Sequence, residues 1–295
     1  MFNHLIVSQM KTTVILLIAS AVIATTAVAC KKEKQADTKR MLLCFTPYTV
    51  TPMDRGQATV VNLADIVTKL DLYLVNAADH DTIEIHQDKA TAGNNFGIVD
   101  VDLLIDKTYD LYALAHKFTD PVEFDGERFT FPSNENFRQT LYAYAQFCPG
   151  TTASLTVEMQ RIVGMFKLVI PEEGVPAEVS KMRFLIDSMG MAFNVDGYAE
   201  DIQQRTATIN SLTPNSGSIT FNVFVTADTM DAINTVDIIA DALDASDQIV
   251  KRRIFTEVPI KAGYMTTFSG VFFNDAAFEV TFTAGDWQSF DPTPF

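Results

Sequence analysis

Cys30 is the residue whose chemistry the sequence assigns most clearly. It follows Ala27-Val28-Ala29, at the end of an uncharged apolar stretch that begins after Lys11. Small side chains before a cysteine suit a signal peptidase that cuts in front of a lipid-carrying thiol. We therefore predict cleavage after Ala29 and acylation of Cys30, whether translation starts at Met1 or at Met10. Several acyl chains, palmitate among them, would make this anchoring stable.

Acid, base and metal-ligand side chains gather at one turn, Asp79-His80-Asp81, with His86 and Asp88 farther along the chain. If the flanking strands pair, His86 lies away from the tip, so these side chains could hardly share one metal ion. We interpret the segment as a polar turn. The acidic stretch 237–247 contains no glycine and lacks the alternate oxygen donors of a calcium loop. We therefore predict neither a metal site nor a cofactor.

Motifs for catalysis and for nucleic-acid binding are both missing from the sequence. It contains no Gly-x-Ser-x-Gly elbow, no phosphate-binding glycine loop and no His-Glu-x-x-His pair. The formal charge is −15, and no segment clusters Lys or Arg with aromatic residues. Such an acidic chain repels phosphate backbones. We predict a protein that is not an enzyme and has no nucleic-acid partner.

Two further cysteines and one basic pair leave alternatives open. Cys44 and Cys148 would lie in an oxidising compartment after export, where they could form one disulfide or stay as two separately buried thiols. Lys39-Arg40 precedes an apolar run, so a protease could cut after Arg40. Alternatively, the pair is the charged end of a linker, which is the interpretation that we favour.

Apolar residues with a period of two dominate the rest of the chain. This pattern predicts strands, the first two of which should form a hairpin around a turn at 76–81. Helical spacing appears only around Leu63–Leu70 and at 228–233. Many short strands with few helices indicate an all-β fold of antiparallel sandwiches. The principal predicted strands are 70–74, 82–86, 109–116, 155–159, 219–225 and 278–282.

The domain organisation follows from composition. Residues 1–29 are predicted as the signal peptide, and the polar segment 30–40 as a flexible tether that cannot bury enough apolar surface to order itself. The remaining 255 or so residues fit two domains of ordinary size. A Pro-Gly pair at 149–150 breaks regular structure, so we predict one β-sandwich at 41–150 and a second at 151–295.

Aromatic residues support a competing function, glycan binding. Surface proteins that hold glycans use exposed Trp and Tyr rings, and Trp287 and several tyrosines are available. Tyr142 and Tyr144 share one strand face, as do Phe278, Val280 and Phe282. We expect both groups to be core residues of a sandwich.

One segment resembles a known family. The run Leu155 to Pro171, with Arg161 near its middle, is similar to the central signature of the anchor and minor-subunit lipoproteins of Bacteroidales-type, or type V, fimbriae. Segments 63–74, 96–97, 109–116, 255–259 and 266–273 match the family pattern in the same order. The resemblance spans about Leu42 to Trp287.

The resemblance implies two transthyretin-like antiparallel β-sandwich domains in tandem and a structural role in fimbriae, with cell adhesion as the setting. It also implies a lipid-anchored protein of the outer membrane, and Lys31 after the cysteine agrees with that membrane. Fimbrial subunits of this kind exchange strands with their neighbours. The expected partners are therefore fimbrial subunits and outer-membrane lipid. The C-terminal 291–295 contains two prolines and makes a poor donor strand, which favours an anchor or accessory subunit.

Overall fold

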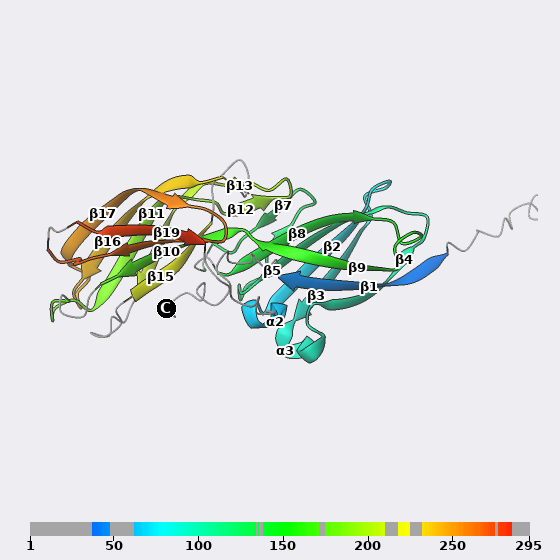
Figure 1. The fold of residues 1–295 in the computed structure, drawn as a ribbon, viewed down its shortest axis with the longest axis horizontal. Helices are drawn as coiled ribbons and strands as arrows, with labels where there is room; N and C mark the ends of the chain where they lie inside the picture. Colours follow the sequence, from blue (N-terminus) through cyan, green and yellow to red (C-terminus); the bar gives the residue numbers. More distant parts are fainter. Residues whose placement is uncertain are drawn as a thin grey trace, which may run out of the picture. The chain divides into compact units, whose positions relative to one another are not determined.

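The computed structural model describes residues 37–47, 62–133, 135, 138–170, 175–209, 218–224, 232–274 and 277–284. Strands account for 61% of it and helices for 5%, so the predicted all-β fold with few short helices is confirmed (Figure 1). None of the helices in these ranges is long and apolar enough to cross a membrane. The predicted signal peptide and Cys30 lie outside the described residues.

A seven-stranded sheet in the order β3-β2-β5-β8-β9-β1-β4 forms from the first half of the chain and β9. The predicted hairpin is confirmed: β2 and β3 pair antiparallel from Lys69 and Asp88 onward. The Asn76 side chain accepts the Ala78 N–H at 3.1 Å inside its turn. The strands are β1 (Thr38–Pro47), β2 (Lys69–Asn76), β3 (Thr82–Asp88), β4 (Ile98–Leu104), β5 (Tyr109–His116), β8 (Thr140–Phe147) and β9 (Ser154–Arg161).

This sheet curves around its own core. Leucines from β2 and Met41, Leu43 and Phe45 from β1 belong to one buried cluster, which α2 (Leu63–Ile66) also joins. The two end strands of the sheet, β3 and β4, also come close to each other. The Gln87 amide of β3 donates to the Ile98 carbonyl of β4 at 2.7 Å. Helix α3 (Lys89–Ala92) and the 3-10 turn η1 (Gly93–Asn95) connect β3 to β4. The short helix or helical turn expected around Leu63–Leu70 is confirmed as α2, which is followed directly by β2.

Two four-stranded sheets, β15-β10-β18-β19 and β14-β11-β16-β17, form from the second half of the chain. Phe166 from the first sheet and Phe184 and Phe255 from the second meet in one core cluster, so the two sheets pack face to face. The strands are β10 (Val163–Val169), β11 (Lys181–Met189), β14 (Gln203–Ile209), β15 (Ser218–Phe224), β16 (Asn234–Leu243), β17 (Ile249–Ile260), β18 (Tyr264–Ser269) and β19 (Glu279–Ala284).

A small fourth sheet, β13-β12-β7-β6, joins segments that are far apart in the sequence. Phe129 and Phe193 lie opposite each other in its β7–β12 register, and both are buried. These strands are β6 (Glu123–Phe124), β7 (Arg128–Thr130), β12 (Ala192–Asn194) and β13 (Ala199–Glu200). The sequence patterns did not indicate this sheet, because strands of two or three residues are too short to show a period.

Strand β19 and the junction between β9 and β10 both bear on predictions made from the sequence. The expectation that Val280 of β19 is a core residue is wrong, because Val280 is 49% exposed and the buried cluster reaches Phe278 on this face but not Val280. The chain passes from the seven-stranded sheet to the next sheet at Ile162, between β9 and β10, so β9 pairs with β1 and β8 rather than with the second half. The division into 41–150 and 151–295 stays a prediction. Most of the helix expected at 228–233 lies outside the residues that the structure describes.

Candidate functional site

Strand β1 contains the basic pair Lys39-Arg40 and the apolar run that follows it. It lies between β9 and β4 and runs parallel to β9, with Phe45 opposite Val157 in the register (Figure 1). Its burial alternates: Met41, Leu43 and Phe45 are at most 4% exposed, whereas Leu42 is 40% exposed. A strand close to the chain's amino end therefore supplies three interior side chains to the core of a sheet built mainly from later segments.

The residues around β1 hold it by specific contacts. The Lys39 ammonium donates to the carbonyls of Pro149 and Thr152 at 2.9 and 2.8 Å. The Arg40 guanidinium pairs with Asp100 of β4 at 3.0 Å. Gly97, with a φ of 85°, accepts the Phe45 N–H at 2.8 Å and comes so close that an added Cβ would lie 3.3 Å from the Phe45 carbonyl. The basic pair therefore belongs to a strand, not to the end of the tether.

The two cysteines of the described residues are both free and partly buried. Cys44 lies in β1, opposite Thr156 of β9. Cys148 lies just after β8, where its thiol faces the Ile105 carbonyl at 3.4 Å.

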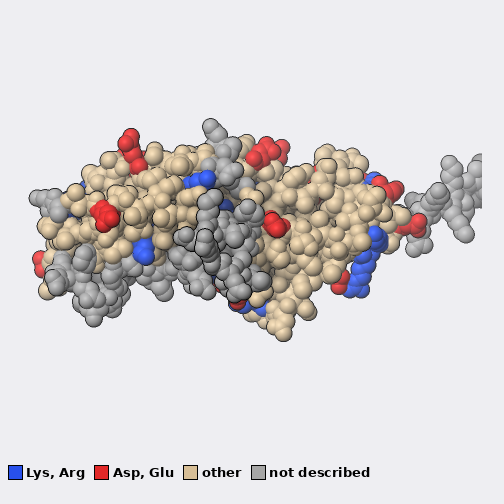
Figure 2. Space-filling view, viewed as in Figure 1, with Lys and Arg blue, Asp and Glu red and all other residues tan. Residues whose placement is uncertain are grey.

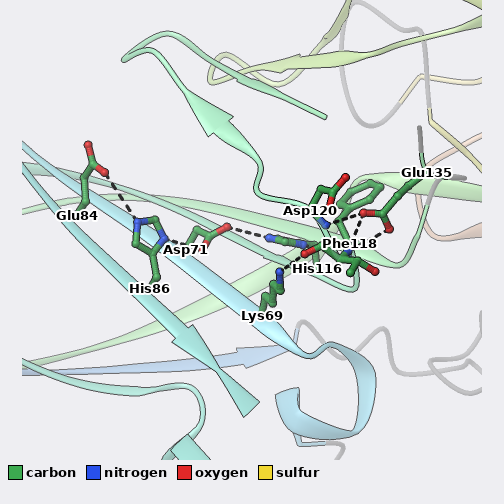
Figure 3. Close-up of polar contacts among 9 residues, drawn as sticks. Lys69, Asp71, Glu84, His86, His116, Phe118, Asp120 and Glu135 are labelled. Atoms are coloured by element: carbon green, nitrogen blue, oxygen red, sulfur yellow. Dashed lines mark hydrogen bonds and ion pairs between the residues drawn. The ribbon is translucent and has the colours of Figure 1, made fainter. Parts of the chain in front are cut away.

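Asp71 is the centre of a polar cluster on the face of β2 opposite to its core leucines (Figure 3). Its carboxylate accepts from His86 Nδ1 of β3 and from His116 Nε2 of β5, both at 2.8 Å. The Phe118 N–H donates to His116 Nδ1 at 3.1 Å, so the proton of that ring lies on Nε2, where it reaches Asp71. Asp71 thus links three neighbouring strands through two histidines.

The electrostatics of this cluster favour an ionised carboxylate. Burial of Asp71 acts to raise its pKa, but the hydrogen bonds and charges of His116 and His86 outweigh burial, and the pKa is lowered. The outer nitrogen of His86 lies 3.8 Å from Glu84 on the exposed side. The Glu135 carboxylate accepts the N–H groups of residues 119 and 120 and so holds the loop after β5. The geometry is that of a link between strands.

The turn at 79–81 and the acidic stretch 237–247 do not gather into metal sites. His80, which has a φ of 61°, lies in the turn, whereas His86 faces Asp71. In the turn between β16 and β17, Asp244 accepts the N–H groups of residues 246 and 248 at 2.8 and 2.9 Å. Asp241 is fully buried between two arginines. Across the described ranges no three acidic, His or Cys side chains are placed to hold a metal ion.

The tyrosines of β8 differ from the prediction. Tyr142 is a core residue, and its hydroxyl donates to the Val195 carbonyl at 2.9 Å. Tyr144 is 50% exposed, so the expectation that both are core residues is wrong for it. The small sheet packs on Tyr142, whose ring contacts Phe193 of β12, but it does not extend over Tyr144. Trp287 lies outside the described residues.

On the described part of one face, charged side chains are scattered rather than gathered in one place (Figure 2). On the face drawn in Figure 2, small groups of Lys and Arg alternate with groups of Asp and Glu, and uncharged side chains cover most of the described surface between them.

Comparisons with known proteins give a consistent set of solved structures. No protein-family model matches the chain, and no curated protein sequence matches it. A candidate polysaccharide-binding protein from Bacteroides thetaiotaomicron superposes with a TM-score of 0.54 at 11% identity, covering 83% of this chain and 96% of that one. A candidate adhesin from the same species gives 0.51 at 13% identity, with 83% and 97% covered.

The fimbrial anchor protein Mfa2 from Porphyromonas gingivalis is also among the structural neighbours. Its TM-score is 0.46 at 9% identity, with 84% of this chain and 98% of that one covered. The structural neighbours thus include proteins that are named as adhesins and one that is named as a fimbrial anchor. At these identities the likeness concerns architecture, and this chain has the all-β fold of the two Bacteroides thetaiotaomicron proteins.

Proposed function

We propose that this chain is a non-enzymatic structural subunit or anchor of cell-surface fimbriae. In this proposal a lipid on Cys30 holds it to the outer membrane, and other subunits join it by β-strand complementation. The observation that carries the proposal is β1, a strand that lies between β9 and β4 in the seven-stranded sheet. The shared fold of candidate adhesins supports the same role.

Strand β1 has the properties that an exchangeable strand needs. Its backbone pairs with β9 over six residues, and alternate side chains enter the core. A partner strand with apolar residues at the same alternate positions could make the same main-chain hydrogen bonds and fill the same places.

The contacts of Arg40 favour an anchor that is not cut. The bond between Arg40 and Met41 lies within β1, and the Met41 side chain is fully buried. A protease would need this segment to leave the sheet first, because cleavage requires local opening. Retention of the Arg40–Met41 bond would keep the lipid on Cys30 attached to the folded chain.

Mass spectrometry of the mature amino terminus tests this proposal. Washed outer membranes and sheared fimbriae are prepared from cells that express the chain, and the terminus is read in each fraction. We expect an acylated Cys30 in the membranes together with copurifying fimbrial subunits. The variant Cys30→Ala should be absent from the membrane fraction, whereas the matched control Cys44→Ala should behave like the wild type.

Other outcomes of this experiment would change the proposal. A Met41 terminus in sheared polymers would mean a processed subunit instead of an anchor. Absence of the chain from every fraction that contains fimbrial subunits would refute the assembly role.

A peptide competition experiment tests strand complementation separately. A synthetic peptide with the sequence of residues 38–47 is added while fimbriae assemble on cells. We expect it to reduce incorporation of this chain, because it offers the same alternating side chains as β1. A peptide of equal composition whose order breaks the alternation is the control. If both peptides act equally or neither acts, β1 is not the exchanged strand.

Glycan binding is a second candidate function. A half-exposed tyrosine pair on the seven-stranded sheet, Tyr112 and Tyr144, specifically favours it.

A further inference from the structure

Three tyrosines form a row across neighbouring strands of the seven-stranded sheet. Tyr73 of β2 lies opposite Tyr112 of β5, and Tyr112 lies opposite Tyr144 of β8. Exposure increases along the row: Tyr73 is 3% exposed, Tyr112 is half-buried and Tyr144 is 50% exposed. The row therefore begins in the core and ends at the surface.

The inner part of the row is covered by the small sheet. Phe124 of β6 packs on Tyr73 with ring centroids 4.4 Å apart, and it contacts Tyr112 at 5.6 Å. The outer pair, Tyr112 and Tyr144, has its centroids 5.4 Å apart and its planes tilted by 33°. Two aromatic rings thus lie side by side at the edge of the cover, and the outer ring is open to solvent.

A polar pair lies beside these rings on the same sheet face. Asp110 and Gln146 are opposite each other in the register, two residues from Tyr112 and Tyr144 along their strands. The Tyr144 hydroxyl and the Gln146 amide both donate to Asp110 Oδ1, at 2.7 and 2.8 Å. The Asp110 hydrogen bond raises the pKa of Tyr144 to about 12, so its hydroxyl stays protonated. The four side chains are therefore fixed relative to one another.

We propose that Tyr112, Tyr144, Asp110 and Gln146 form a binding platform for a neutral oligosaccharide. The aromatic faces suit the apolar C–H face of a pyranose ring. Asp110 Oδ2 and Gln146 Oε1 accept no hydrogen bond from the described residues, so they can accept from sugar hydroxyls. The inference rests on glycan binding as the second candidate function and names its site.

Charge argues for a neutral ligand over a charged one. Burial raises the pKa of Tyr112, and the charges of Asp110 and Asp196 raise it further. These two carboxylates near the ring repel sulfated or uronic sugars. A cation would be attracted to Asp110, but the two hydrogen bonds that Asp110 Oδ1 accepts spread the charge of the carboxylate and weaken that attraction. A neutral polyhydroxyl chain satisfies the remaining acceptors without an unpaired charge.

Calorimetric titration of the purified full chain tests the platform. The probes are cellohexaose, maltohexaose, xylohexaose and mannohexaose, each titrated to millimolar concentration. We expect at least one to bind with a millimolar or lower Kd. Tyr144→Ala should raise that Kd about tenfold, because the open ring face is lost. Tyr144→Phe keeps the face and should stay within about fivefold of the wild type, since it loses one hydrogen bond.

The control variant is Ile254→Ala, which removes a side chain that is 60% exposed elsewhere and should leave the Kd unchanged. Thermal unfolding of each variant verifies that it is folded. Absence of binding to all four hexaoses overturns the inference, as does equal binding by Tyr144→Ala. Choline or a heparin hexasaccharide binding better than every neutral sugar also overturns it. These failures leave fimbrial assembly untouched, because that proposal depends on β1 and Cys30.

Discussion

Adjacent leucines in β1 offer a direct test of how this strand is held. Leu42 and Leu43 have the same chemistry and neighbouring positions, but Leu43 is fully buried and Leu42 is 40% exposed. We expect Leu43→Ala to destabilise the fold strongly and Leu42→Ala to have little effect. The comparison cancels everything except the side of the strand on which the leucine lies.

The magnitudes follow from burial. Leu43 belongs to the core cluster of the seven-stranded sheet, so its truncation leaves a cavity there and should lower the free energy of unfolding by about 3–5 kcal/mol. Truncation of the exposed Leu42 should change it by about 0.5 kcal/mol or less. A loss of about 3 kcal/mol lowers the urea midpoint by about 1–3 M for usual denaturant slopes.

Urea unfolding followed by circular dichroism measures both variants against the wild type. The denaturant slope should stay the same, since neither change alters the surface that unfolding exposes by much. Equal midpoints for the two variants would refute the inserted position of β1. A large effect of Leu42→Ala with none of Leu43→Ala would mean that β1 lies in the opposite register.

Three further predictions concern other groups. The pKa of Asp71 is lowered in the folded protein, so the ionised carboxylate stabilises the fold above the ordinary pKa near 4, and this stabilisation is lost as pH falls through the folded pKa. The free energy of unfolding of Asp71→Asn should therefore depend less on pH in that range. Urea midpoints at several pH values measure this. Asp241→Asn, which removes the partner of two arginines, should cost about 1–3 kcal/mol in thermal or urea unfolding. The control Asp79→Asn breaks an exposed pair and should cost under about 1 kcal/mol. Cys44 and Cys148 should both react with iodoacetamide in unfolded, unreduced protein, which mass spectrometry detects and a disulfide would prevent.

Period-two patterns were sufficient for the main strands and for the fold class. The predicted strand 109–116 coincides with β5, and the hairpin of β2 and β3 has the predicted turn. These features depend on neighbouring residues, whose alternation and turn propensities are local. The acidic stretch 237–247 lies in the hairpin of β16 and β17, where Asp244 holds the turn, and Asp241 is buried rather than solvated.

The polar cluster shows where the sequence was insufficient. Asp71 and His116 are 45 positions apart, and only the pairing of β2 with β5 brings them together. A weak signal was present, since Asp71 interrupts a run of leucines on a strand. Its partners could not be named without the strand order.

The sequence by itself determined the alternation of the predicted strands, the export signal with Cys30 that we predict, and the family that the chain resembles. Only the tertiary structure decided which face of a strand is covered. Tyr142 and Tyr144 occupy the same face of β8, and their periodicity is identical, but the small sheet packs on the first and ends before the second. Period two assigns a side chain to a face, whereas burial depends on what lies on that face, and here that is a sheet assembled from segments far apart along the chain.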